Sequence, residues 1–268
     1  MTTTRTSSPS RTAALTHPLR PAAWRHAVSV DLTKASYAAP LRVGLAVGLV
    51  LIGGGLLGLR DVAGLAALGT LVSAFGRSEP YRARISRLTA LGVGITASIA
   101  IGGLVGLSGG ALPVEIEVIA LLSGLSALYV GALRIAGPGP VIYIFAATAA
   151  AGFVDDATDL WRAVAAAAVG STLGVLASVA PWLFAHARRR ALGGPAVDDP
   201  PTAPELSVRR SLRRCGQRTL LATAGRMTLA AAVSAVIALL LSIVAASLGR
   251  WADTAVGWLV DLFLAVPH

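Results

Sequence analysis

Long apolar runs alternate with short polar segments along most of this chain. A helix crosses a hydrocarbon core of about 30 Å in ~20 residues. Seven runs come near that length: Leu41–Leu59, Val62–Phe75, Leu88–Leu107, Ile116–Leu133, Val141–Val154, Leu160–Ala187 and Thr228–Ser247. The second and fifth are short, so each either extends into its flanking turn or is a re-entrant or broken helix packed inside the bundle. The pattern predicts an all-α polytopic membrane protein.

The basic residues predict how these helices are oriented. Of 23 Lys and Arg residues, 20 lie in alternate gaps between the runs, and only Arg60, Arg162 and Arg250 lie in the others. Cytoplasmic loops carry such an excess of basic residues. We therefore expect a multi-pass protein of the inner (plasma) membrane with a cytoplasmic N-terminus, whose six-helix bundle begins and ends inside the cell.

The same pattern divides the chain into four parts. Residues 1–40 are expected to be a cytoplasmic tail, in which Trp24–Tyr37 is either an interfacial helix or a plain linker. Residues 41–187 form the six-helix transmembrane block, and 188–227 form a basic cytoplasmic linker. Residues 228–268 begin a second, truncated block of one or two helices, and the pattern leaves open whether 252–268 cross the membrane.

Composition narrows the class of partner. With 55% apolar residues, 13% charged residues and a mean hydropathy of +0.72, the chain has more apolar surface than one soluble core can bury. A net charge of +10 favours nucleic-acid binding in a soluble protein, but here the basic residues lie beside apolar spans. We expect the lipid bilayer as a partner and no nucleic acid. Because Cys215 stands alone and no catalytic motif occurs, we expect no metal, no cofactor and no enzyme activity.

Glycines recur at a spacing that lets helices approach closely. The GxxxG pairs are Gly44 with Gly48, Gly54 with Gly58, Gly102 with Gly106, and Gly170 with Gly174. In a membrane, small residues allow backbones to pack where the hydrophobic effect gives no help. The pairs are consistent either with packing inside one bundle or with a dimer face.

One turn interrupts the chain between the fourth and fifth runs. Arg134 is followed by Gly137, Pro138, Gly139 and Pro140, and prolines without N–H groups cannot continue a helix. The stretch is either a tight cytoplasmic turn or the mouth of a path, where exposed backbone and a guanidinium attract an anionic substrate.

Acidic residues gather on the opposite side. Asp155, Asp156 and Asp159 precede the sixth run, and ionisable residues deep in the spans are nearly absent. These three carboxylates are either solvated helix flanks or members of a proton relay.

A resemblance to a known family rests on three segments. They are Gly76-Arg-Ser-Glu-Pro-Tyr-Arg-Ala-Arg84 followed by Arg87, Pro40-Leu-Arg-Val, and Gly137-Pro-Gly-Pro leading into Val141-Ile-Tyr-Ile-Phe145. Here the chain resembles the fusaric-acid-resistance-like (FUSC) family, which is related to the aromatic acid exporters. The resemblance covers roughly Pro40 to Ala187. It implies an inner-membrane block of six helices, often duplicated around a cytoplasmic segment, and efflux of aromatic carboxylic acids.

We therefore expect a secondary exporter, or part of one, for small aromatic or amphipathic organic acids. Arg82, Arg84, Arg87 and Arg134 would concentrate the organic anion at a cytoplasmic entrance, or the first three would only fix topology and anchor lipid head groups. Arg226 before the seventh run matches Arg42 before the first, so a second block begins and is cut short. Two chains pairing as a homo-oligomer would restore it, or the chain is a degenerate member of the family with little transport activity. The alternative is a membrane scaffold or accessory subunit that transports nothing.

Overall fold

The structure is a computed structural model that describes residues 38–75, 79–109, 112–135, 139–192, 207–248 and 258. The chain divides into two units, and the first, Met1–Ala38, lies almost wholly outside the described residues. The expectations for the tail before Ala38, for residues 193–206 of the linker, and for nearly all of 252–268 also lie outside them.

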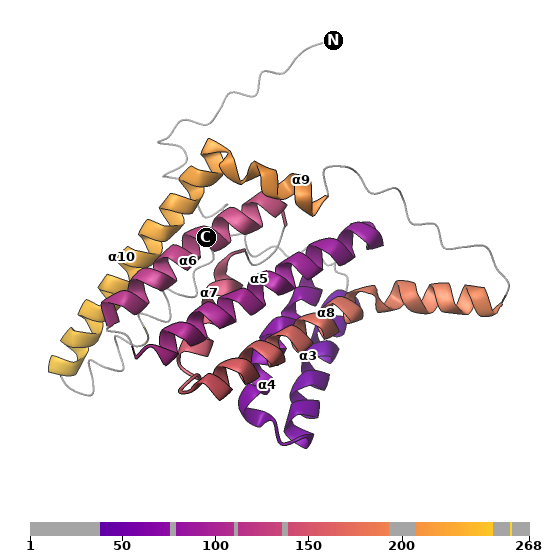
Figure 1. Cartoon of the computed structure of the whole chain (residues 1–268), viewed down its shortest axis with the longest axis horizontal. Coiled ribbons are helices and arrows are strands. Elements are labelled where there is room, and N and C mark those ends of the chain that lie inside the picture. The colour runs from indigo at the N-terminus through magenta and orange to yellow at the C-terminus, as the bar shows by residue number, and fades with distance from the viewer. Residues whose placement is uncertain are drawn as a thin grey trace, which may run out of the picture. The chain divides into compact units, whose positions relative to one another are not determined.

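The described residues are helical (Figure 1). The α-helices are α3 (Ala38–Leu56), α4 (Arg60–Thr70), α5 (Tyr81–Leu107), α6 (Leu112–Leu133), α7 (Val141–Ala151), α8 (Ala157–Ala191), α9 (Val208–Leu212) and α10 (Arg218–Leu248). Two short 3₁₀ helices, η3 (Leu71–Ala74) and η5 (Arg213–Gly216), follow α4 and α9.

Four of these helices are long and apolar enough to cross a membrane: α5, α6, α8 and α10. Over its described residues the chain is thus all-helical and suited to a membrane, as its hydrophobic pattern predicts. α3 and α7 are apolar but shorter. The 11 residues of α7 rise about 16 Å, roughly half of a hydrocarbon core. α4 also has 11 residues, and η3 prolongs it.

The short helices are the most enclosed elements. α4 packs on α8, α7 packs on α5, and the long helices α5 and α8 pack on each other. Val62, Leu65 and Ala66 of α4 are buried, as are Tyr143 and Ala146 of α7. The fifth run is therefore a short helix inside the bundle, which is one of the two forms that its length allows.

The seventh span lies against the fourth. α10 packs along α6, and the two run in opposite directions because Gly131 faces Leu220 whereas Gly124 faces Thr228 (Figure 1). The Ser123 hydroxyl donates to the Met227 carbonyl at 3.3 Å. α10 begins at Arg218, ten residues before the predicted span, because its polar first turns continue the same helix.

Two of the predicted GxxxG pairs pack inside the bundle. A Cβ added to Gly102 or Gly106 would collide with the backbone of α7, and one added to Gly170 or Gly174 would collide with that of α4. These contacts confirm the packing interpretation for both pairs. A Cβ added to Gly44 or Gly48 of α3 would meet nothing within 4 Å, so this pair does not pack within the described residues.

Candidate functional site

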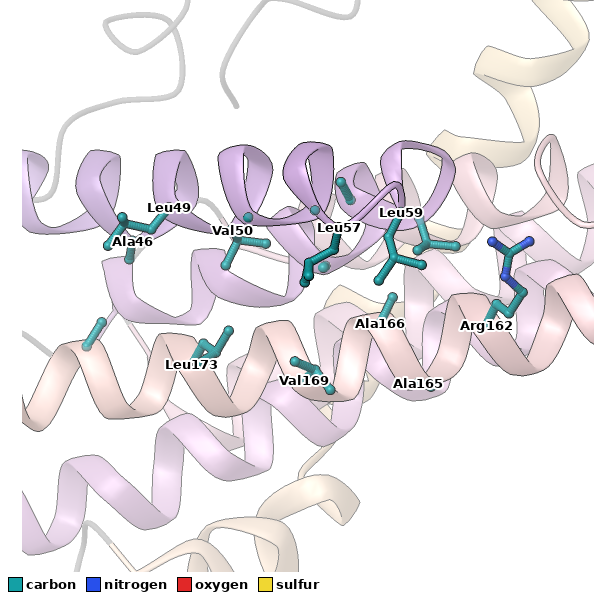
Figure 2. A pocket seen from close by; sticks show the side chains of 16 residues that line it. Ala46, Leu49, Val50, Leu57, Leu59, Arg162, Ala165, Ala166, Val169 and Leu173 are labelled. Atoms are coloured by element: carbon teal, nitrogen blue, oxygen red, sulfur yellow. The ribbon is translucent and has the colours of Figure 1, made fainter.

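An open-sided cavity of about 570 Å³ lies between α3 and the pair formed by α4 and α8, next to the point where Gly54 of α3 packs on Ala63 of α4. Its lining is aliphatic on all three sides, from Leu49 and Val50 on α3, Val62 on α4, and Val169 and Leu173 on α8. Figure 2 shows the side chains of α3 and α8 facing each other across this space. Such a lining accepts an apolar body and offers few hydrogen bonds along its length.

The charged side chain in the lining is Arg162, at one end of the cavity (Figure 2). Its guanidinium lies 2.5 Å from the Asp61 carboxylate of α4 and 3.7 Å from the Asp159 carboxylate on its own helix. These contacts tie the first turn of α8 to the first turn of α4. The side chains of Arg162 and Asp61 remain about two-fifths exposed, so solvent or a ligand can reach them.

The three aspartates of the predicted relay lie at the start of α8. Asp156 is the N-cap, and its side chain accepts from the Asp159 N–H at 2.8 Å, which satisfies one of the free donors of the first turn. Asp159 also contacts Arg162. Asp155 is exposed just before the cap. Asp156 and Asp159 thus have roles in starting and anchoring α8, and a relay through the three stays a prediction.

At the other end of the bundle, Arg87 is almost fully buried. Its guanidinium lies 2.9 Å from a Glu79 carboxylate oxygen and donates to the carbonyl of Leu133, the last residue of α6. The last carbonyls of a helix lack partners within the helix and carry its negative dipole end. Arg87 therefore fixes the end of α6 to the start of α5.

Arg84 is buried beside this pair. It donates to the Glu79 carbonyl at 3.1 Å, and its guanidinium lies 4.8 Å from the centre of the Tyr81 ring. The Tyr81 ring stacks on Trp182 of α8. Arg82, between them in sequence, is exposed. Of the three predicted entrance arginines of α5, Arg84 and Arg87 thus hold protein groups, and Arg82 faces outward.

Arg134 occupies a position that usually belongs to glycine. It follows the last residue of α6 with a φ of 50°, the one positive φ of a non-glycine residue in the described part of the chain. Its N–H donates to the Gly131 carbonyl, and the N–H of Ile135 donates to that of Val130. This is the Schellman arrangement that ends many helices. The exposed side chain therefore stands on strained backbone, which is found where structure or function over-determines a residue.

The rest of the turn is described in part. Gly139 has a φ of 68°, and Pro140 is the N-cap of α7, with its carbonyl accepting from the Tyr143 N–H at 3.1 Å. Gly137 and Pro138 lie outside the described residues. The predicted break between α6 and α7 is confirmed at Gly139 and Pro140.

A pair of tyrosines escaped the sequence analysis. The rings of Tyr129 on α6 and Tyr143 on α7 meet edge to face, with centres 6.2 Å apart. The Tyr129 hydroxyl donates to the Ala90 carbonyl of α5 at 2.7 Å. The Tyr143 hydroxyl is buried and has no hydrogen-bond partner among the described residues. An unpaired buried hydroxyl is costly and calls for an explanation.

Over the described ranges, no cluster of three or more His, Cys, Asp or Glu residues is arranged to hold a metal ion. The chain matches no protein-family model, no curated protein and no solved structure. Its function is therefore argued from its own geometry.

Proposed function

We propose that this protein is a secondary exporter of small amphipathic organic acids, aromatic acids included, in the inner (plasma) membrane. The observation that carries the proposal is the cavity beside α3, which has aliphatic walls and a guanidinium at one end. Its volume of about 570 Å³ suits a small organic molecule. The apolar body of an acid would lie along the walls, with its carboxylate at Arg162.

The contacts of Arg162 support a site from which cargo can leave. A guanidinium binds a carboxylate through two parallel hydrogen bonds. Asp61 already occupies Arg162 at 2.5 Å, so an incoming acid must replace one carboxylate with another. Exchange of this kind keeps the charge paired throughout and holds the cargo weakly, as export requires.

The two ends of the bundle differ in charge, which supports a direction. Arg84, Arg87 and Arg134 lie where α5 begins and α6 ends, whereas Asp61 and Asp159 lie where α4 and α8 begin. By the excess of basic residues in cytoplasmic segments, the arginine end faces the cytoplasm and the N-terminus lies inside. The exposed side chains of Arg82 and Arg134 then attract organic anions to that face.

The test is the accumulation of aromatic and aliphatic carboxylates in cells that depend on this protein. Arg162→Gln keeps the polar group and removes the charge, and Val169→Trp narrows the cavity. Both should raise cellular accumulation of at least one acid severalfold. Arg60→Gln is the matched control, because Arg60 begins α4 outside the cavity lining and its loss should leave export unchanged.

Two further outcomes decide separate parts of the proposal. Arg134→Gln should reduce export if this arginine gathers anions at the entrance; normal export would remove Arg134 from the path. If Arg162→Gln and Val169→Trp both export the whole panel like wild type, the cavity is not the cargo site.

A second candidate function is a membrane scaffold or accessory subunit. The observation in its favour is the face of α3, where Gly44 and Gly48 meet nothing within 4 Å and Leu45 and Ile52 are exposed. Small residues in such a pattern suit a close contact with another helix, including that of a second copy. The mass of the protein in nanodiscs tests the homo-oligomer: a stable monomer that still exports would remove this candidate.

A further inference from the structure

The two short helices have the same length and equivalent positions. α4 (Arg60–Thr70) and α7 (Val141–Ala151) each contain 11 residues, and every position of α7 lies 81 places after its equivalent in α4 (141 − 60). Each is the middle helix of a set of three: α3, α4 and α5 in the first set, and α6, α7 and α8 in the second. Each packs on the last helix of the other set, α4 on α8 and α7 on α5.

The contacts within these two pairs have the same register. Each involves a glycine that faces the backbone of a short helix: Gly102 on Ala147, Gly106 on Ala151, Gly170 on Ala66, and Gly174 on Thr70. The two glycine pairs are 68 places apart (170 − 102 and 174 − 106). The residues that they meet, Ala66 with Ala147 and Thr70 with Ala151, are 81 places apart (147 − 66 and 151 − 70). A shift of 81 places from α4 to α7, together with a shift of 68 places between α5 and α8, thus converts the α4–α8 interface into the α7–α5 interface.

The crossing of α5 and α8 gives an independent check. If a two-fold axis passes through this crossing, each contact must have an image in which the two helices exchange roles. Gly92 faces Ser171, and Gly103 faces Leu160. Adding 68 to Gly92 gives position 160, and adding 68 to Gly103 gives position 171. The two contacts are therefore images of each other under the shift that the glycine pairs define.

The two sets run in opposite directions. α4 is parallel to α8, α8 is antiparallel to α5, and α5 is parallel to α7, as the residue pairs above require. α4 and α7 therefore point opposite ways, as do α5 and α8. Sets with this relation are inverted-topology repeats, and in transporters the substrate site lies at their interface and is opened by one repeat moving against the other.

One difference between the repeats is the cavity. In the second set, α6 is packed against α5 and α7. Arg87 of α5 donates to the Leu133 carbonyl of α6, Tyr129 of α6 donates to α5, and the Tyr129 ring contacts Tyr143 of α7. In the first set, α3 meets α4 at Gly54 and Ala63, and the cavity lies between α3 and the pair α4 and α8 beside that contact. Two residues of the cavity lining show what lies at the equivalent place in the second set. Moving back 68 places from Arg162 leads to Gly94, and moving forward 81 places from Val62 leads to Tyr143. At Gly94 the nearest side chains are Tyr143 and Tyr129, which fill that space.

We propose that residues 38–107 and 112–191 are inverted repeats, and that the counterpart of the cavity, now filled by Tyr129 and Tyr143, opens to the opposite side when α3 closes on α4 and α8. The exchange of cavities rests on the proposed export function, whereas the repeat itself does not. In the alternate state the Tyr143 hydroxyl donates a hydrogen bond to the carboxylate of the cargo. This accounts for a buried hydroxyl that has no partner among the described residues in the present state.

Cysteine chemistry in the full-length chain tests the exchange without any cargo. In a Cys215→Ser background, Val50→Cys and Val169→Cys form a pair across the cavity, from α3 and α8 (Figure 2). A third change, Ser98→Cys, reports on the counterpart, because Ser98 is 2% exposed and lies 68 places before Ala166 of the cavity lining (166 − 98). The protein is reconstituted in liposomes, oxidised to close the disulfide, and then labelled with N-ethylmaleimide.

We expect the disulfide to form and the labelling rate of Ser98→Cys to rise about tenfold or more, because an alternate state populated at no more than ~10% becomes the main one. The same variant before oxidation is the reference for this rate, and it controls for any effect of the substitutions on folding. Ser178→Cys, which is buried in α8 outside the mapped lining, should label equally slowly in both.

Two results would overturn the inference: no disulfide between α3 and α8, or a disulfide with unchanged labelling of Ser98→Cys. A third result would separate the two proposals. If the labelling shows the exchange of cavities, but cells with Arg162→Gln or Val169→Trp accumulate every acid like wild type, the proposed export function is contradicted and the inverted repeat still stands.

Discussion

Arg87 gives the sharpest test of how the helices are held together. Arg87→Met keeps the length of the side chain and removes its charge and donors. The change leaves a Glu79 carboxylate that is 15% exposed, and the terminal carbonyl of α6, without their cationic partner. Breaking a buried ion pair from one side costs about 3–5 kcal/mol, because the remaining charge stays buried and uncompensated.

The size of this cost predicts a measurable fall in melting temperature. One kcal/mol corresponds to about 2–4 °C for chains near this size, so Arg87→Met should melt roughly 6–20 °C lower. The assay is gel filtration of the detergent-solubilised protein after heating to a series of temperatures. Arg82→Met is the matched control, because Arg82 is exposed in the first turn of the same helix and should change stability by no more than about 0.5 kcal/mol.

The double variant Glu79→Gln/Arg87→Met separates the ion pair from the cap. With both charges removed, part of the loss should return, because no unpaired carboxylate is left, while the uncapped end of α6 keeps the variant below wild type. Equal melting temperatures for Arg87→Met and Arg82→Met would refute the reasoning.

Three other predictions concern local structure. Gly102→Leu should abolish the monodisperse gel-filtration peak, because its Cβ would collide with the α7 backbone, whereas Gly44→Leu should leave the peak intact; equal behaviour would contradict the assigned packing. Asp156→Ala should cost about 1 kcal/mol by removing the N-cap of α8, which is visible as a melting point lower by a few degrees. Arg134→Gly should raise the melting point by a few degrees, because glycine adopts a positive φ without the ~1 kcal/mol penalty of a side chain; a decrease would show that the side chain contributes more than its backbone costs.

The apolar pattern located every described membrane helix but placed several ends too far inward. The third span was predicted from Leu88, whereas α5 begins at Tyr81. Arg84 and Arg87 made this segment look like a loop. Both can be buried because Glu79, Tyr81 and the carbonyl end of α6 interact with their guanidinium groups. Hydropathy carries no information about such partners.

The cavity and the tyrosine pair depend on which helices are neighbours, and a periodic pattern does not specify that. Tyr143 stood in the predicted fifth span as one apolar residue among others. Its role emerges only when α5, α6 and α7 are brought together. Arg134 was singled out because it precedes a break, but its positive φ was not foreseen, since a helix that ends in this way usually has glycine at that position.

Transport of a labelled aromatic carboxylate by purified protein in liposomes tests the central claim most directly. The account predicts saturable uptake that is inhibited by other aromatic carboxylates. Arg162→Gln should abolish this uptake, and Arg60→Gln should leave it unchanged. Uptake no faster than in protein-free liposomes, for every acid of a broad panel, would contradict it.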